Sequence, residues 1–260
     1  MRKLLIAAAS AVLVSGAAHA VPTMLLTVST TDNVNELTCN MTVGGSPVCS
    51  FTMGGGSLLF ATSAGPNAFV YQGSMGGWNF SFSTASTNAP GLATGANLGM
   101  SFGSLTKDVG TTASKALEFS LSGNGFTMPT GPLIAMGGSV NVTQGLASGV
   151  SANGTFSAKE DGGVALPITS PDATASCVGA VNGSLFGCGI SPQEWLRGTS
   201  PTFSLQQVIT FNMTAGAQGL SATSTVNATN AVPEPMTSAL VGLGLFGAAY
   251  FSRRRAAKLA

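Results

Sequence analysis

The chain has 260 residues, of which 7% are charged, and a formal net charge of +1. The positive charge belongs to the two ends, because residues 21–231 hold four basic and eight acidic residues, and four minus eight gives −4. A mildly acidic segment without a basic stripe is poorly suited to nucleic-acid binding. The composition also argues against disorder, which needs high charge and few aromatic residues, whereas Phe, Trp, Leu and Val recur here at a regular period.

The first twenty residues have the order of a secretory signal peptide. Arg2 and Lys3 precede an apolar run at 4–14, and small residues continue to Ala18 and Ala20. The apolar run is shorter than the roughly 20 residues that span a bilayer, and the Ala-x-Ala pattern suits a signal peptidase. We therefore expect signal peptidase to cut after Ala20, so that residues 1–20 are removed from an exported protein.

Period-two alternation, typical of β-strands, dominates the exported segment, 21–231. The stretch GWNFSFST, 77–84, places Trp and Phe on one face and polar residues on the other. In chain order, the stretches with strand character are 22–30, 36–43, 57–63, 68–74, 77–84, 97–104, 115–122, 138–143, 153–159, 204–213 and 219–228. Many short strands with one polar face predict an all-β fold, an antiparallel β-sandwich, for which a jelly-roll arrangement is one form.

One short stretch of the same segment predicts a helix instead. In SPQEWLRG, 191–198, Ser191 suits an N-cap, Pro192 the first helical position and Gly198 the stop. No other stretch sustains an apolar 3.6-residue period.

The exported segment holds four cysteines, Cys39, Cys49, Cys177 and Cys188. An even number in an oxidising compartment favours disulfides, and a zinc site lacks both C-x-x-C spacing and histidine. Three pairings are possible, and we choose the local one, 39–49 with 177–188. For the second pair, Asn-Gly at 182–183 favours a two-residue hairpin turn. That turn would place Cys177 directly opposite Cys188, within disulfide reach.

Catalysis by histidine is excluded, because the one histidine, His19, lies in the signal peptide. This excludes Ser-His-Asp catalysis, Cys-His catalysis and metal sites built from histidine. We expect neither metal nor cofactor. Paired carboxylates leave glycoside hydrolysis open. The candidate carboxylates are Glu160, Asp161, Asp172 and Glu194. Glu160 and Asp161 precede two glycines, a pattern that favours a polar hairpin turn.

Trp195 is the candidate ligand contact, because it stands beside Glu194 in the predicted helix. The flat apolar face of a tryptophan suits stacking on a sugar ring. Core packing is the alternative for a tryptophan in an exported domain, as it is for the alternating Trp78.

The C-terminal end, 232–260, has three parts in a fixed order. The tripeptide Pro233-Glu234-Pro235 is stiff and extended, because proline fixes its own φ and restricts the preceding residue. Residues 236–252 carry no charge and reach the short limit for a transmembrane helix. The basic cluster that follows consists of Arg253, Arg254 and Arg255. By the positive-inside rule it holds this end in the cytoplasm, so the domain lies outside.

This order closely resembles the PEP-CTERM sorting signal of bacterial exported proteins, over residues 232–258. The resemblance implies processing by an exosortase, a membrane cysteine protease that cuts near the tripeptide, so that the membrane anchor is transient. It also implies a Gram-negative bacterium that makes exopolysaccharide, and a place in a biofilm or floc matrix. Three stretches between 70 and 213, VYQGSMGGWNFSFSTASTNAPG, LSGNGFTMPTGPL and PTFSLQQVITF, resemble a recurrent PEP-CTERM ectodomain type. That resemblance implies a β-sandwich and no particular activity.

We therefore expect a non-enzymatic exported protein, sorted by an exosortase and placed at the cell surface or in an exopolysaccharide matrix. Two alternatives stay open. One is a carbohydrate-binding, lectin-like module that uses Trp195, and the other is a glycan-cleaving enzyme that uses the four carboxylates.

Overall fold

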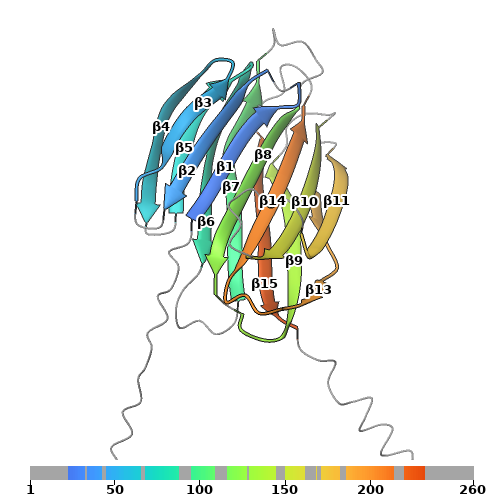
Figure 1. Ribbon diagram of the computed structural model, residues 1–260. Coiled ribbons are helices and arrows are strands. Elements are labelled where there is room, and N and C mark those ends of the chain that lie inside the picture. Colours follow the sequence, from blue (N-terminus) through green and yellow to red (C-terminus); the bar gives the residue numbers. More distant parts are fainter. Residues whose placement is uncertain are drawn as a thin grey trace, which may run out of the picture.

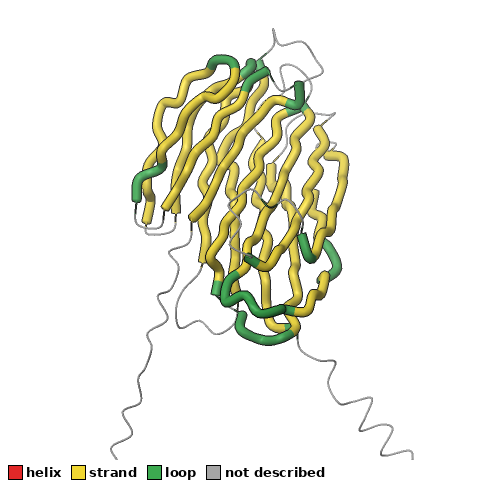
Figure 2. Tube along the Cα trace, in the orientation of Figure 1, coloured by secondary structure: helices red, strands yellow, loops and turns green. Residues whose placement is uncertain are grey.

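The computed structural model describes residues 23–231, except 33, 43–44, 66–67, 88–94, 109–115, 128, 145–149, 162–167, 169–170, 182–185 and 214–219. The elements in this part are β-strands, and they form two layers (Figures 1 and 2). The predicted signal peptide and the predicted C-terminal segment lie outside these residues. Within them, no helix has the length and apolar character needed to cross a membrane.

One layer is a seven-stranded antiparallel sheet. From edge to edge its strands are β11 (Ala173–Val181), β10 (Val150–Glu160), β14 (Phe203–Asn212), β8 (Leu117–Phe126), β1 (Thr23–Thr30), β2 (Glu36–Thr42) and β3 (Val48–Met53).

The other layer is an eight-stranded antiparallel sheet. Its strands run in the order β12 (Phe186–Gly189), β9 (Leu133–Gln144), β15 (Leu220–Asn230), β7 (Gly95–Lys107), β6 (Trp78–Thr87), β5 (Ala68–Met75) and β4 (Gly56–Gly65), and β13 (Gln193–Leu196) also pairs with β9. The all-β, antiparallel β-sandwich predicted from the alternation is confirmed.

The chain fills the two layers in two different ways. Strands β4 to β7 form a meander within the eight-stranded sheet, whereas from β7 to β10 each successive strand changes sheet. At the hairpin between β5 and β6, Gly76 and Gly77 have φ values of 57° and 80°. Positive φ at both central residues is the requirement of a type I′ turn, and this turn sets the register in which Met75 pairs with Trp78.

The inward positions of both sheets form one core. Burial alternates residue by residue along β1 and β5, because successive side chains of a strand point to opposite faces. Aromatic rings interlock across the layers: Phe119 of β8 lies 5.1 Å from Phe82 of β6 and 4.7 Å from Phe102 of β7, between ring centroids. Such pairs add about 0.5–1.5 kcal/mol each beyond the burial of their area.

The helix predicted at 191–198 is wrong, because residues 193–196 form β13. Trp195 pairs with Ile134 and Leu196 with Leu133 along the open edge of β9. A single helical turn fixes several residues for one hydrogen bond, whereas a short strand beside β9 gains ladder hydrogen bonds at once. The capping signals at Ser191 and Gly198 were therefore overridden by tertiary pairing.

Candidate functional site

Three of the four carboxylates predicted from the sequence, Glu160, Asp161 and Asp172, lie near the end of β10. Asp161 links three strands there. One oxygen of its carboxylate accepts a hydrogen bond from the backbone N–H of Gly125, at 3.0 Å, and the other accepts one from the Ser204 hydroxyl. Gly125 belongs to β8 and Ser204 to β14. Asp161 is thus committed to a structural role.

Asp172 and Glu160 lie on either side of the connection from β10 to β11. The Asp172 carboxylate accepts a hydrogen bond from the backbone N–H of Glu160, at 2.7 Å. Oε1 of Glu160 is buried and has no hydrogen-bond partner in the described part of the chain. A β-carbon on Gly198 would lie 2.6 Å from Oε2 of Glu160, so a larger residue at 198 would require the Glu160 side chain to shift.

Arg197 closes the same end of the sandwich from the segment after β13. Its guanidinium donates hydrogen bonds to the backbone carbonyls of Ser200, Pro129 and Pro201, and lies 5.6 Å from the centre of the Phe203 ring. Burial lowers the pKa of Arg197, and the nearby carboxylates of Glu160 and Asp161 oppose that shift. With its donors directed at carbonyls, Arg197 stabilises the loops of this end.

Trp195 lies in the interior of the protein. Its side chain is 6% exposed and its ring packs edge-on against Phe203, with centroids 6.0 Å apart. A sugar platform needs an open ring face, which this tryptophan does not present. Glu194, its neighbour on β13, is exposed. Among the residues that the structure describes, no group of three or more His, Cys, Asp or Glu side chains is placed to hold a metal ion.

A second location, which the sequence did not single out, is a groove on the outer face of the eight-stranded sheet. We call it the outer groove; its volume is about 210 Å³, and it crosses β4, β5, β6 and β7. Two rows of paired outward residues form its floor. The first row is Gln72, Ser81 and Ser104, and the second is Ser57, Ser74 and Asn79.

Two β-bulges flank the first row of the outer groove. On β4, Leu58 pairs with Gly73 and Phe60 with Gln72, so Leu59 is the extra residue. On β7, Ser104 pairs with Ser81 and Phe102 with Phe82, which makes Gly103 the extra residue. Bulges bend a strand and redirect side chains. Leu59 is 68% exposed, and it forms an apolar lip beside a polar floor.

The outer groove lies on a sheet that carries almost no charge. Apart from β13, the strands of the eight-stranded sheet contain one charged residue, Lys107. Lys107 is 3% exposed, its Nζ donates a hydrogen bond to the Met213 carbonyl at 3.1 Å, and it lies 5.0 Å from the centre of the Trp78 ring. Burial lowers the pKa of Lys107. The outward face of these strands is therefore uncharged.

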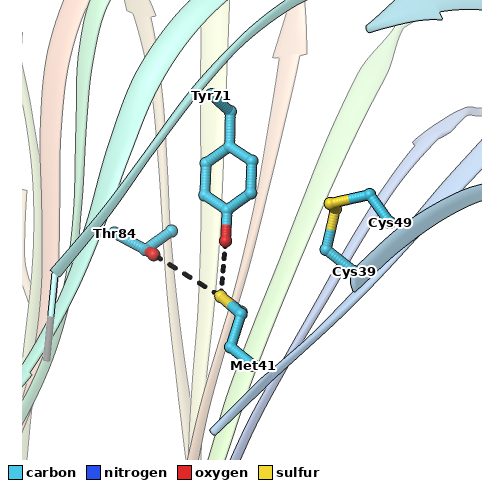
Figure 3. The surroundings of a disulfide bond; sticks show 5 residues. All are labelled: Cys39, Met41, Cys49, Tyr71 and Thr84. Atoms are coloured by element: carbon cyan, nitrogen blue, oxygen red, sulfur yellow. Dashed lines mark hydrogen bonds between the residues drawn. A yellow bond between two sulfur atoms is a disulfide. The ribbon is translucent and has the colours of Figure 1, made fainter. Parts of the chain in front are cut away.

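The predicted disulfide between Cys39 and Cys49 joins β2 to the edge strand β3. The two residues are directly paired across the strands, with Cα atoms 4.0 Å apart. Figure 3 shows the disulfide next to Met41, whose sulfur accepts hydrogen bonds from the hydroxyls of Tyr71 and Thr84. Burial raises the pKa of the Tyr71 hydroxyl, and the hydrogen bond with Thr84 lowers it by less.

The hairpin predicted around Cys177 and Cys188 is wrong. Cys177 belongs to β11, which pairs with β10 at the edge of one sheet, whereas Cys188 belongs to β12, which pairs with β9 at the edge of the other. Cys188 is disulfide-bonded. The side chain of Cys177 lies outside what the structure describes, so the pairing of 177 with 188 stays a prediction.

Several predicted sites fall outside the described residues altogether. They are the signal cleavage site at Ala18 and Ala20, the tripeptide Pro233-Glu234-Pro235 and the basic cluster Arg253, Arg254 and Arg255.

Comparison with known proteins gave three results. No curated protein sequence matches the chain. Two solved structures show a slight likeness: the family 11 carbohydrate-binding module of the cellulosomal cellulase Lic26A-Cel5E of Clostridium thermocellum, and a family 11 module from the same organism in complex with a β-1,3-1,4-mixed-linked tetrasaccharide. The first is 12% identical and covers 70% of this chain and 98% of its own; the second is 14% identical and covers 69% and 98%; both have a TM-score of 0.26. Likeness at this level does not establish a shared ligand.

Residues 231–255 match the family model described as the PEP-CTERM protein-sorting motif.

Proposed function

We propose that this chain, which carries a PEP-CTERM sorting motif, is a non-enzymatic exported protein that an exosortase processes and leaves at the cell surface or in an exopolysaccharide matrix. The motif covers residues 231–255 and implies export and a membrane-anchored sorting step. Signal peptidase is the second processing partner, acting at Ala20. The proposed location in a biofilm matrix is inferred from the resemblance to PEP-CTERM proteins.

The observation that carries this proposal is where the motif begins. Strand β15 ends at Asn230, and the motif starts at the next residue. The backbone N–H of Ala231 donates a hydrogen bond to the Leu133 carbonyl at 3.0 Å, which secures the end of the domain against β9. A cut near Pro233-Glu234-Pro235 therefore removes none of the strands that the structure describes.

The arrangement of the carboxylates supports a non-enzymatic role. Hydrolysis of a glycoside needs one carboxyl group as acid and another as base or nucleophile, both open to the sugar. Asp161 and Asp172 instead bind backbone N–H groups of the protein itself. Glu194 lies on the separate strand β13.

The test is the intact mass of the protein released by cells that have or lack the exosortase. We expect the released form to end near residues 233–235 in the parent strain, and the uncut chain to stay with the membrane in the strain without the protease. Pro233→Ala with Pro235→Ala should also block release, whereas Pro171→Ala, in an exposed loop, should not. Retention of residues 236–260 on most released copies would refute the proposal.

A further inference from the structure

We propose that the outer groove binds a segment of a neutral, hydroxyl-rich polysaccharide chain. The inference rests on the proposed function, because export is what brings the domain next to extracellular glycan. It assigns the binding to the polar rows on β4 to β7 and not to Trp195, which is buried.

The polar side chains of the outer groove are almost all free to bind a ligand. In the part of the chain that the structure describes, the side chains of Ser57, Gln72, Ser74, Ser81 and Ser104 make no hydrogen bond to protein. Asn79 uses one amide hydrogen, donated to Asp108 at 3.0 Å. Serine hydroxyls and carboxamides both donate and accept, which is the pairing that sugar hydroxyls require.

The other outer face of the sandwich provides a contrast. There the polar side chains bind one another: Gln206 donates to Ser120 at 3.1 Å, and Thr52 donates to Glu36 at 2.6 Å. That face also carries charge, at Glu36, Glu118 and Lys159. Unpaired polar rows are thus a feature of the groove, not of every outward surface of this fold.

The residues that line the outer groove carry no charge. The strands β4, β5 and β6 contain no ionisable acid or base apart from the buried Tyr71, and Lys107 of β7 is buried. The exposed Asp108 carboxylate, which accepts the hydrogen bond from Asn79, adds negative charge beside the groove. A polyuronate or a sulfated chain would therefore meet a like charge and no cation among the lining residues. The matching ligand is therefore neutral.

The length of the outer groove also suits a chain of sugars. Neighbouring strands lie about 4.7–4.9 Å apart, so the groove, which crosses β4 to β7, is about 14 Å long and exceeds a single sugar ring. The bulges at Leu59 and Gly103 stand at the two ends of the first row. An open, elongated groove with a polar floor and one apolar lip suits a stretch of a chain lying across the strands.

The experiment measures binding of neutral hexasaccharides to the purified full chain in a detergent without a sugar headgroup. The probes are cellohexaose, laminarihexaose and mannohexaose, with an alginate hexasaccharide as the charged comparison. Isothermal titration gives the affinity, and amide hydrogen exchange gives the location. We expect at least one neutral probe to bind in preference to alginate and to protect amides of β4 to β7.

The variant Gln72→Ala with Ser81→Ala removes two polar groups of the first row, and it should weaken binding at least about tenfold. The matched control is Gln206→Ala with Ser120→Ala, the same two changes on the outer face of the other sheet, which should leave binding unchanged. Circular dichroism and the thermal midpoint establish that both variants fold.

Three results would overturn the inference: no neutral probe binds at millimolar concentration, alginate binds as tightly as the neutral probes, or the two double variants lose affinity equally. None of these bears on the intact mass of the released protein. A failure of the groove and a failure of the sorting proposal are therefore distinguishable.

Discussion

Gln207 of β14 is fully buried inside the sandwich, between the buried residues Leu205 and Ile209 on the inward face of the strand. Its amide nitrogen donates to the Leu98 carbonyl of β7 at 3.2 Å, and its amide oxygen accepts from the Ser224 hydroxyl of β15 at 2.7 Å. Both partners belong to the opposite sheet. A buried amide with its partners in place fixes how the two layers align, whereas a half-satisfied one is costly.

Substitution of either Gln207 or Ser224 should destabilise the protein by about 1–3 kcal/mol, because it leaves a buried polar atom of the other residue unpaired. Gln207→Leu together with Ser224→Ala should cost clearly less than the sum of the two single changes. Urea unfolding of the parent, the two single variants and the double variant measures the four unfolding free energies of this double-mutant cycle, provided that the m-value does not change. Gln206→Leu, a change at the next residue but facing outward, serves as the control; strictly additive effects at 207 and 224 would contradict the argument.

Tyr71 makes the stability of the core sensitive to alkaline pH. Its hydroxyl is buried against the Met41 sulfur, and burial raises its pKa. The folded state thus favours the neutral hydroxyl. Its contribution is complete below the pKa of about 10 that tyrosine has in an unfolded chain, and it is lost as the pH rises above that value.

We expect the unfolding free energy of the parent protein to fall more steeply above pH 10 than that of Tyr71→Phe, while the two curves run parallel between pH 7 and 9. Denaturant unfolding at each pH measures both curves. Parallel curves up to pH 12 would show that Tyr71 does not titrate with unfolding.

At the scale of elements, the edge strand β3 depends on its covalent link to β2. Its outward residues Val48 and Met53 are 72% and 41% exposed, so it buries little apolar surface of its own. An exposed apolar edge invites pairing with other chains. The disulfide between Cys39 and Cys49 holds β3 in register at this edge.

Cys39→Ala with Cys49→Ala should lower the unfolding free energy by about 2–3 kcal/mol, because the bond closes a loop with a sequence separation of 10. It should also increase aggregation, measured by light scattering during a thermal ramp. Val48→Ala on the same strand should change stability by less than about 0.5 kcal/mol. A double variant as stable as the parent would show that pairing alone holds β3.

The elements that sequence reasoning found and missed differ in what stabilises them. Strands β1, β5, β6 and β14 alternate apolar and polar residues because one face of each lies on the core. Strands β3 and β13 lack that pattern and form because a neighbouring strand offers a free edge. Cys39 and Cys49 lie directly opposite each other on paired strands. The sequence predicted that arrangement for Cys177 and Cys188, which instead belong to strands of different sheets.

At the scale of the whole molecule, the two outer faces differ in character. The acidic and basic residues of the strands lie mainly on the seven-stranded sheet, and the other sheet presents serine, threonine, asparagine and glutamine. The sequence already lists these residues, but their shared face depends on strand order. The outer groove joins residues 57 and 104 because the β4–β7 meander lays four strands side by side.

The sequence by itself predicted the local and the linear features of this protein: the alternation that makes it all-β, the local pairing of Cys39 with Cys49 among three possible pairings, and the ordered sorting motif near the C-terminal end. These depend on nearest neighbours along the chain or on a continuous run of residues. The tertiary structure alone decided that Trp195 is buried, that Asp161 and Asp172 bind backbone groups, and that two polar rows meet in a groove lined by uncharged residues. Each of these depends on which strands become neighbours, and strand pairing is settled by long-range packing of the two sheets.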